Sequence, residues 1–208
     1  IALNRGSYYF SSQNGRVERR LIADDGSPVG NPNFTRVDPA GAANQLFINP
    51  FVLHPTLTNR MFYAGGDRVW RNSDLTAIPL GGLTATSVNW SQLASTVLSG
   101  RTICALEHSY NAPSDRLYFG TTNGQVYRLD GSLGANPTLV DVWTGKGLPA
   151  DAYVSAIATD FTDGNKALLA FSNYEVISLY YTSNGGTTWS AVAGNLEQFG
   201  NGQGNGPS

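Results

Sequence analysis

The sequence predicts an all-β fold built from about four copies of one four-stranded antiparallel unit. Three observations support this prediction. Of the 208 residues, 24 are Gly and 10 are Pro, whereas only 13% are charged, a composition typical of short strands joined by tight turns. One strand–turn–strand pattern recurs four times along the chain, and one large aromatic residue follows each copy.

The repeated pattern is clearest in two segments, residues 9–19 (YFSSQNGRVER) and 118–128 (YFGTTNGQVYR), and looser copies occupy residues 62–71 and 169–178. Each copy reads as two strands joined by a tight turn such as Asn-Gly. The copies align on four valines, Val17, Val69, Val126 and Val176. The spacings between them are 52, 57 and 50 residues. Periods of this length are typical of β-propeller blades, each a four-stranded antiparallel sheet.

Two further strands complete the predicted blade. An apolar run precedes three of the copies, at residues 51–53, 103–106 and 154–158, and suits the buried first strand nearest a propeller axis. An outer strand follows each copy and carries the large aromatic residue. These aromatics are Phe34, Trp90, Trp143 and Trp189. Because they recur once per unit, we expect them to pack between neighbouring blades.

The repeat sets the domain organisation, a β-propeller region over residues 1–199. Residues 46–98, 99–149 and 150–197 form complete blades, and residues 1–45 form a blade that lacks its first strand. Residues 200–208, GNGQGNGPS, read as a linker or tail. A propeller closes its ring to avoid open sheet edges. We therefore expect these blades to belong to a larger propeller, with neighbouring blades or domains in a longer chain.

Residues 182–189, TSNGGTTW, resemble the Asp-box, the BNR repeat S/T-x-D-x-G-x-T-W, with Asn where the repeat usually has Asp. The matching positions are Thr182, Asn184, Gly186, Thr188 and Trp189. The resemblance implies a structural hairpin between the third and fourth strands of a blade. The wider pattern is similar to the propellers of sialidases, sortilin-type receptors and xyloglucanases, and within that group to those of exported bacterial proteins.

Composition limits the partners and the location of the protein. The formal charge is −2 and no long run of like charges occurs, so we expect no nucleic-acid partner. No apolar run reaches the length of a membrane span. Few Lys and Glu residues, together with the sequons Asn33-Phe34-Thr35 and Asn89-Trp90-Ser91, favour a secreted or extracellular protein, with bacterial export. Cys104 lies in an apolar run and reads as a buried core residue.

The residues favour a binding module over an enzyme. A xyloglucanase-like site needs two carboxylates facing each other across a cleft. The loop candidates are Asp38, Asp67, Asp141, Asp160 and Asp163, and each reads more simply as a turn residue. A sialidase-like site needs an arginine cluster, whereas Arg116 and Arg128 recur at repeated blade positions. His54 and His108 read as turn residues.

No tight ligand spacing indicates a metal, and no glycine-rich turn precedes a helix, so we expect no metal or other cofactor. The prediction is a non-catalytic secreted module that binds a protein or polysaccharide ligand on a propeller face, or that scaffolds an extracellular assembly. The alternative is part of a glycoside hydrolase propeller, xyloglucanase-like or sialidase-like.

Overall fold

The structure, a computed structural model, describes residues 6–113 and 115–194; residues 200–208, predicted as a linker or tail, lie outside them. The chain divides into two compact units between Ala94 and Ser95. Apart from strands, the regular elements of the described part are two 3-10 helices, η1 (Leu75–Ala77) and η2 (Ala94–Thr96). None of its helices is long and apolar enough to cross a membrane. The all-β prediction is confirmed.

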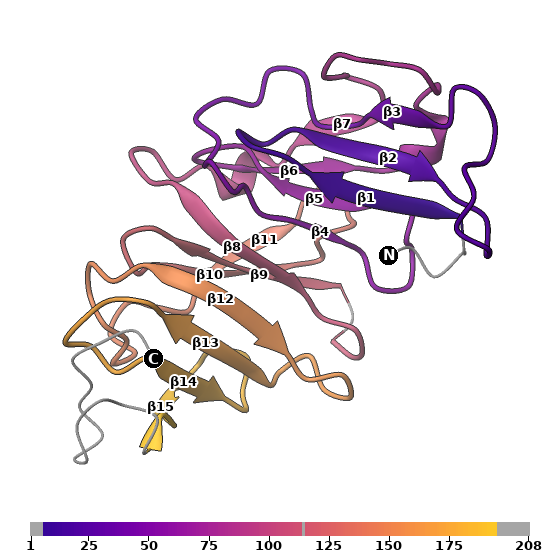
Figure 1. Ribbon diagram of the computed structural model, residues 1–208. Coiled ribbons are helices and arrows are strands. Elements are labelled where there is room, and N and C mark those ends of the chain that lie inside the picture. The colour runs from indigo at the N-terminus through magenta and orange to yellow at the C-terminus, as the bar shows by residue number, and fades with distance from the viewer. Residues whose placement is uncertain (1–5, 114, 195–208) are drawn as a thin grey trace. The chain divides into compact units, whose positions relative to one another are not determined.

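The first unit contains two antiparallel sheets, which Figure 1 draws in indigo to magenta. Their strand orders are β1-β2-β3 and β4-β5-β6-β7. The first sheet consists of β1 (Ser7–Ser11), β2 (Val17–Leu21) and β3 (Phe34–Arg36). The second consists of β4 (Phe51–Leu53), β5 (Met61–Ala64), β6 (Val69–Asn72) and β7 (Trp90–Gln92).

The second unit contains two four-stranded antiparallel sheets, with orders β8-β9-β10-β11 and β12-β13-β14-β15. The first consists of β8 (Ile103–His108), β9 (Arg116–Thr121), β10 (Val126–Asp130) and β11 (Thr138–Asp141). The second consists of β12 (Val154–Thr159), β13 (Ala167–Phe171), β14 (Leu179–Thr182) and β15 (Ser190–Ala191). Strands that follow one another in sequence pair in every sheet, which is the connectivity of propeller blades.

The hairpin turns follow the local sequence. Asn14 and Gly15 both have positive φ, 58° and 76°, a backbone region that Asn and Gly adopt more readily than other residues. They lie in the turn that joins β1 to β2, and the amide of Ser12 donates to the oxygen of Arg16 across it at 2.9 Å. Three residues, 13–15, separate this bonded pair, so the Asn-Gly pair lies at the tip of a three-residue hairpin loop.

One backbone hydrogen bond recurs in all four sheets and gives the true alignment of the repeats. In each sheet, the backbone amide of the residue just after the outer strand donates to the backbone oxygen of the first residue of the neighbouring strand. That neighbouring strand is β2, β6, β10 or β14, the third strand of a complete blade. The four bonds are Val37 to Val17, Leu93 to Val69, Val142 to Val126 and Val192 to Leu179. Leu179 therefore holds the position assigned to Val176. That alignment was wrong by three residues because the β13–β14 connection is three residues longer than the β9–β10 connection.

The core of the first unit lies between its two sheets. Val17 and Val37 from the first sheet pack with Met61, Tyr63 and Trp70 from the second, and all five are at least nine-tenths buried. The hydroxyl of Tyr63 donates to the oxygen of Gly15 at 2.7 Å, so the buried phenol is satisfied. The apolar core and this bond hold the loops of the two sheets together.

The sheets of the second unit also pack face to face. Gly120 on β9 faces Val154 on β12 so closely that a Cβ atom at Gly120 would lie 2.4 Å from a Val154 methyl group. Cys104 is buried, as the sequence predicts, and its Sγ donates to the oxygen of Val154 at 3.0 Å. Burial raises the pKa of the Cys104 thiol to about 12, so this cysteine is a neutral core residue and not a nucleophile.

Candidate functional site

The large aromatics of the outer strands lie partly buried, and two of them bond to the neighbouring sheet. Trp90 Nε1 donates to the oxygen of Val37, and Trp189 Nε1 donates to the oxygen of Val142, both at 2.8 Å. Strand register places Phe34 opposite Arg20 and Trp90 opposite Asn72, each the fourth residue counted from the aligned position, Val17 or Val69. Trp189 directly precedes β15, whose first residue, Ser190, pairs with Tyr181, the third residue counted from Leu179. Trp189 is therefore aligned with Phe34 and Trp90. Leu139 holds that position in the third sheet.

Trp143 lies four residues beyond Leu139, so it is not equivalent to the other three aromatics. It follows the turn at Asp141, whose carboxylate accepts from the amide of Trp143 at 2.8 Å. Its indole nitrogen is buried without a hydrogen-bond partner among the described residues. Residue spacing could not show the difference, because the connections between strands vary in length from sheet to sheet.

The TSNGGTTW segment forms the turn between β14 and β15, the third and fourth strands of the last sheet. Asn184 Oδ1 accepts from the amide of Thr188 at 3.0 Å and from the hydroxyl of Thr182 at 3.0 Å. Gly186 has φ 83°, and a Cβ atom there would lie 2.6 Å from that of Val142. Glycine is therefore required both by the backbone conformation and by the packing.

The loop carboxylates considered as catalytic candidates are engaged in structural contacts. Asp38 accepts from the Arg36 guanidinium at 2.7 Å and from the amide of Val17 at 3.1 Å. Asp160 accepts from the amides of Thr162 and Asp163 at 2.7 and 3.0 Å. The remaining contacts are Asp67 with Arg68, Asp141 with Trp143 and Thr144, and Asp163 with Asn165. These are the roles of turn and cap residues.

For three of these residues, Asp67, Asp141 and Asp160, the carboxyl pKa lies below its usual value, which is unfavourable for a general acid. The hydrogen bond from Arg68 lowers the pKa of Asp67, and the hydrogen bond from Thr162 lowers the pKa of Asp160. Burial acts to raise the pKa of Asp141, but the hydrogen bonds from Thr144 outweigh it and lower that pKa. Groups that stay ionised at neutral pH cannot protonate a leaving group efficiently.

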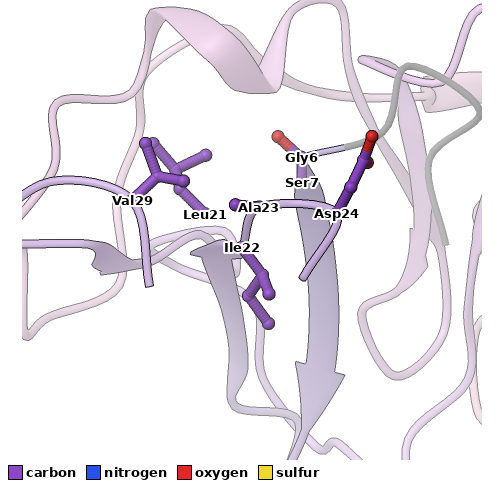
Figure 2. Close-up of a pocket in the computed structure, with 7 residues that line it drawn as sticks. All are labelled: Gly6, Ser7, Leu21, Ile22, Ala23, Asp24 and Val29. Carbon is purple, nitrogen blue, oxygen red and sulfur yellow. The ribbon is translucent and has the colours of Figure 1, made fainter. Parts of the chain in front are cut away.

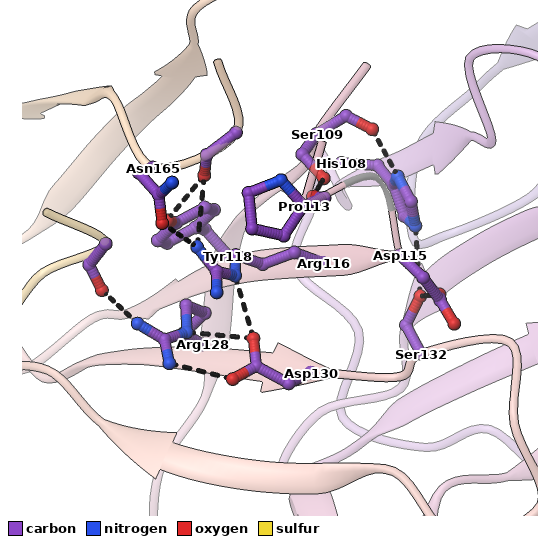
Figure 3. Close-up of polar contacts among 12 residues, drawn as sticks. His108, Ser109, Pro113, Asp115, Arg116, Tyr118, Arg128, Asp130, Ser132 and Asn165 are labelled. Atoms are coloured by element: carbon purple, nitrogen blue, oxygen red, sulfur yellow. Dashed lines mark hydrogen bonds and ion pairs between the residues drawn. The ribbon is translucent and has the colours of Figure 1, made fainter. Parts of the chain in front are cut away.

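Arg116 and Arg128 belong to one ion-pair network in the second unit (Figure 3). Both bond to Asp130, with Nε–Oδ1 distances of 2.8 and 2.9 Å. Arg116 also donates to Asn165 at 2.7 Å, and Arg128 donates to the oxygen of Gly185. Because these guanidinium groups already bond to Asp130 and to the neighbouring sheet, they do not form an open clamp for a ligand carboxylate.

The two histidines are buried and bond to nearby turns. Nδ1 of His54 accepts from the amides of Thr56 and Leu57, at 3.3 and 3.0 Å. His108 contacts the oxygen of Ser109 through Nδ1 and the hydroxyl of Ser132 through Nε2, each at 3.0 Å (Figure 3). Among the described residues, no group of three or more His, Cys, Asp or Glu side chains gathers to hold a metal ion.

A small polar pocket of about 240 Å³ opens on the first unit. It lies between the loop after β3, the β5–β6 turn and the end of β7. Its lining consists of Gly41, Ala43, Asn44, Gly65, Asp67, Arg68, Trp70 and Gln92. Gly65 lets the Trp70 indole lie directly under the turn, because a Cβ atom there would be 2.3 Å from the ring.

The polar groups of this pocket offer both donors and acceptors, with balanced charge. Arg68 bonds to Asp67 at 2.8 Å and to Gln92 Oε1 at 2.9 Å. The Gln92 amide NH₂ group and the side chain of Asn44 make no hydrogen bond to any residue that the structure describes. Sequence reasoning treated Asp67 as a turn residue and missed this pocket, because its lining comes from three segments far apart in the sequence.

A second, wider depression of about 460 Å³ lies near the start of β1 and the end of β2. Figure 2 shows the side chains of Leu21, Ile22 and Val29 at it, with Asp24 on the opposite side. Asp24 is the one ionisable residue in its lining. This wider depression lacks the clustered donors and acceptors of the smaller pocket, so it is a poorer site for a polar ligand.

Glu107 on β8 is a carboxyl group that the sequence analysis did not single out. Its side chain is partly buried and has no hydrogen bond or ion pair with the described residues. Burial alone raises its pKa to about 7. A carboxyl group that stays protonated near neutral pH has the property that a general acid needs.

Comparison with known proteins bears on the fold. No protein-family model matches the sequence, and neither does any curated protein. By structure, the chain is similar to an ancestral GH74 enzyme, with TM-score 0.56 and 13% identity, over 92% of this chain and 23% of that one. It is also similar to the β-propeller domain of Myceliophteria thermophila Cps50 (Swd1), with TM-score 0.51 and 15% identity, over 84% and 47%. The fold is that of β-propeller blades.

Proposed function

We propose that the chain is a non-catalytic β-propeller module of an exported protein, and that it binds a neutral polar ligand such as a glycan. The observation that carries the proposal is the polar pocket of the first unit. Ligand sites combine a concave surface with a few convergent polar groups. A hydroxyl group both donates and accepts hydrogen bonds, so the amides of Asn44 and Gln92 beside Asp67 suit a ligand rich in hydroxyls.

The charges of the pocket favour a neutral ligand. Asp67 and Arg68 neutralise each other, and Arg68 is also engaged by Gln92. An anionic sugar would meet the Asp67 carboxylate and find no unpaired cation. The volume of about 240 Å³ is below the ~300–1,000 Å³ of sites that enclose a drug-sized ligand. One sugar ring at the end of a chain is an occupant of suitable size.

The family assignment is part of the same proposal. We infer that residues 182–189 are an Asp-box hairpin in which Asn184 replaces the usual Asp, since Asn retains the acceptor oxygen used at that site. The module then belongs with the Asp-box propellers and serves in binding or scaffolding outside the cell. Its location rests on the composition and the two sequons.

A part of a glycoside hydrolase remains the second candidate. It is supported by the fold likeness to the GH74 enzyme, of which this chain spans 23%, and by Glu107, whose raised pKa suits a general acid. It would also require a second carboxylate facing Glu107 at the spacing of a glycoside hydrolase pair.

Titration of the ¹⁵N-labelled chain tests the binding proposal. Neutral β-glucan and xyloglucan oligosaccharides should shift the signals of Asn44, Gln92 and the Trp70 indole, and sialylated oligosaccharides should not. Asn44→Gly and Gln92→Ala each remove a hydrogen-bonding side chain from the site, and we expect a roughly tenfold loss of affinity, equivalent to about 1.4 kcal/mol. Gln13→Ala changes an exposed amide elsewhere on the same unit and should leave affinity unchanged. Shifts that map away from the pocket would reject it.

A further inference from the structure

The first sheet has one strand fewer than the others within the described residues. Its β1 takes the place of the second strand of a blade. Tyr9 stands opposite Arg19 in the register in which Phe62 stands opposite Arg71 and Tyr118 opposite Arg128. In the other sheets that second strand pairs on its far side with an inner strand: β4, β8 or β12. No described strand fills this place beside β1.

The backbone groups that face the open edge can be assigned. The bonds from Ser12 N to Arg16 O and from Ile22 N to Gly6 O bracket the β1–β2 ladder. In an antiparallel ladder the bonded pairs alternate, so Tyr8 and Phe10 bond to β2. The N–H and C=O groups of Ser7, Tyr9 and Ser11 therefore point to the other side. The equivalent of Tyr9 in the second sheet, Phe62, faces β4 in this way.

This edge lacks the features that protect free sheet edges. Such edges usually carry a charged side chain, a proline or a bulge. The sequence of β1, Ser-Tyr-Tyr-Phe-Ser, contains no charge and no proline, and its pairing with β2 runs without a register shift. Tyr8 and Phe10 stack on each other with ring centroids 6.5 Å apart, and Phe10 is 49% exposed. The strand is uncharged and free of bulges, so its outer edge is able to pair with another strand.

We propose that the open edge of β1 binds an extended apolar segment, which adds to the sheet antiparallel as its innermost strand. The occupant is an extended apolar strand of the same kind as the inner strands β4, β8 and β12 of the other sheets. Its chemistry follows from the segments that fill this place elsewhere: Phe51–Leu53, Ile103–His108 and Val154–Thr159 are all rich in apolar or small residues. Strand addition of this kind uses main-chain hydrogen bonds for affinity and alternate side chains for specificity. The proposal does not depend on the polar pocket.

Residue-resolved hydrogen exchange on the whole chain tests this inference, with a peptide of residues 150–160, ADAYVSAIATD, as the probe. The free chain should exchange quickly at the amides of Ser7, Tyr9 and Ser11. The peptide should slow exchange at these three amides by about tenfold or more, because each gains a ladder bond. Tyr8 and Phe10 should change little.

Two matched pairs control the experiment. A peptide carrying Ser155→Pro and Ile157→Pro cannot form the ladder and should give no protection. Ser11→Pro removes one edge donor from the chain and should weaken peptide binding, whereas Ser11→Ala keeps the amide and should not. The proposal would be overturned if both peptides gave equal protection or if neither gave any. It would also be overturned if the amides of Ser7, Tyr9 and Ser11 were already protected in the free chain.

Discussion

The indole Nε1 of Trp189 donates a 2.8 Å hydrogen bond to the backbone oxygen of Val142. Val142 is the residue just after the outer strand of the preceding sheet, and its own amide bonds back to Val126. The same arrangement joins Trp90 to Val37 in the first unit. The same contact therefore occurs once within each unit and links the two sheets of that unit at their outer strands.

Replacing Trp189 by Phe should destabilise the chain by about 1–3 kcal/mol, because the buried backbone oxygen of Val142 loses its donor. Trp143→Phe is the matched control, since its indole nitrogen has no partner among the described residues. Urea unfolding followed by tryptophan fluorescence and circular dichroism measures both changes. Equal losses for the two variants would mean that ring volume, rather than the hydrogen bond, carries the effect.

Gly186→Ala should cost about 2–4 kcal/mol, the sum of a strained positive φ and an overlap with Val142. Gly131→Ala separates the two effects. Gly131 also has a positive φ, 67°, but a Cβ atom there would meet nothing within 4 Å, so we expect a loss of about 1 kcal/mol. Thermal unfolding of both variants provides the measurement, and a similar loss in each would contradict the packing described for this turn.

Asn184→Asp should leave stability nearly unchanged, because a carboxylate accepts the same bond from the Thr188 amide. Asn184→Ala should cost about 1–2 kcal/mol, since it removes both that bond and the contact with the Thr182 hydroxyl. Denaturant midpoints compare the three proteins. A large loss with Asp would show that the Nδ2 bond to Thr188 Oγ1 is essential to the turn.

Glu107 should make the chain less stable as the pH rises. Burial raises its folded pKa from 4.5 to about 7, so the folded state holds this proton more tightly than the unfolded state does. The stabilisation is fully present below about pH 4.5 and is lost as the pH rises through about 7. Between those limits, wild type should lose about 1–3 kcal/mol relative to Glu107→Gln, allowing for its partial exposure. Parallel curves for the two proteins would show that Glu107 is not buried as described.

The repeat predicted most of the fold, because each blade carries its own strand and turn residues in sequence order. Asn14-Gly15 specified a hairpin, and the apolar runs before residues 62 and 118 became the inner strands β4 and β8. Loop length was the source of error. The longer β13–β14 connection moved the aligned position from Val176 to Leu179, and a similar variation separated Trp143 from the other outer aromatics.

The candidate site was much less predictable than the fold. The polar pocket joins Asn44, Asp67 and Gln92, which are more than 20 residues apart, and none belongs to a recognisable motif. Glu107 directly follows the apolar run at residues 103–106, and nothing in the sequence indicated that its carboxyl group would be buried without a partner among the described residues. The lining of a pocket and the burial of a carboxyl group depend on which strands and loops meet in space. The sequence of one repeat does not contain this information.

The proposed function is binding without catalysis, and a combined assay on the 208-residue chain tests both halves of it. Fluorescently labelled β-glucan and xyloglucan oligosaccharides are incubated with wild type and with Glu107→Gln, and both anisotropy and product chromatography are followed. We expect both proteins to bind the oligosaccharides without producing shortened products, and we expect Gln92→Ala to weaken the binding. Shortened products from wild type that disappear with Glu107→Gln would contradict the proposed function and identify the chain as part of a hydrolase.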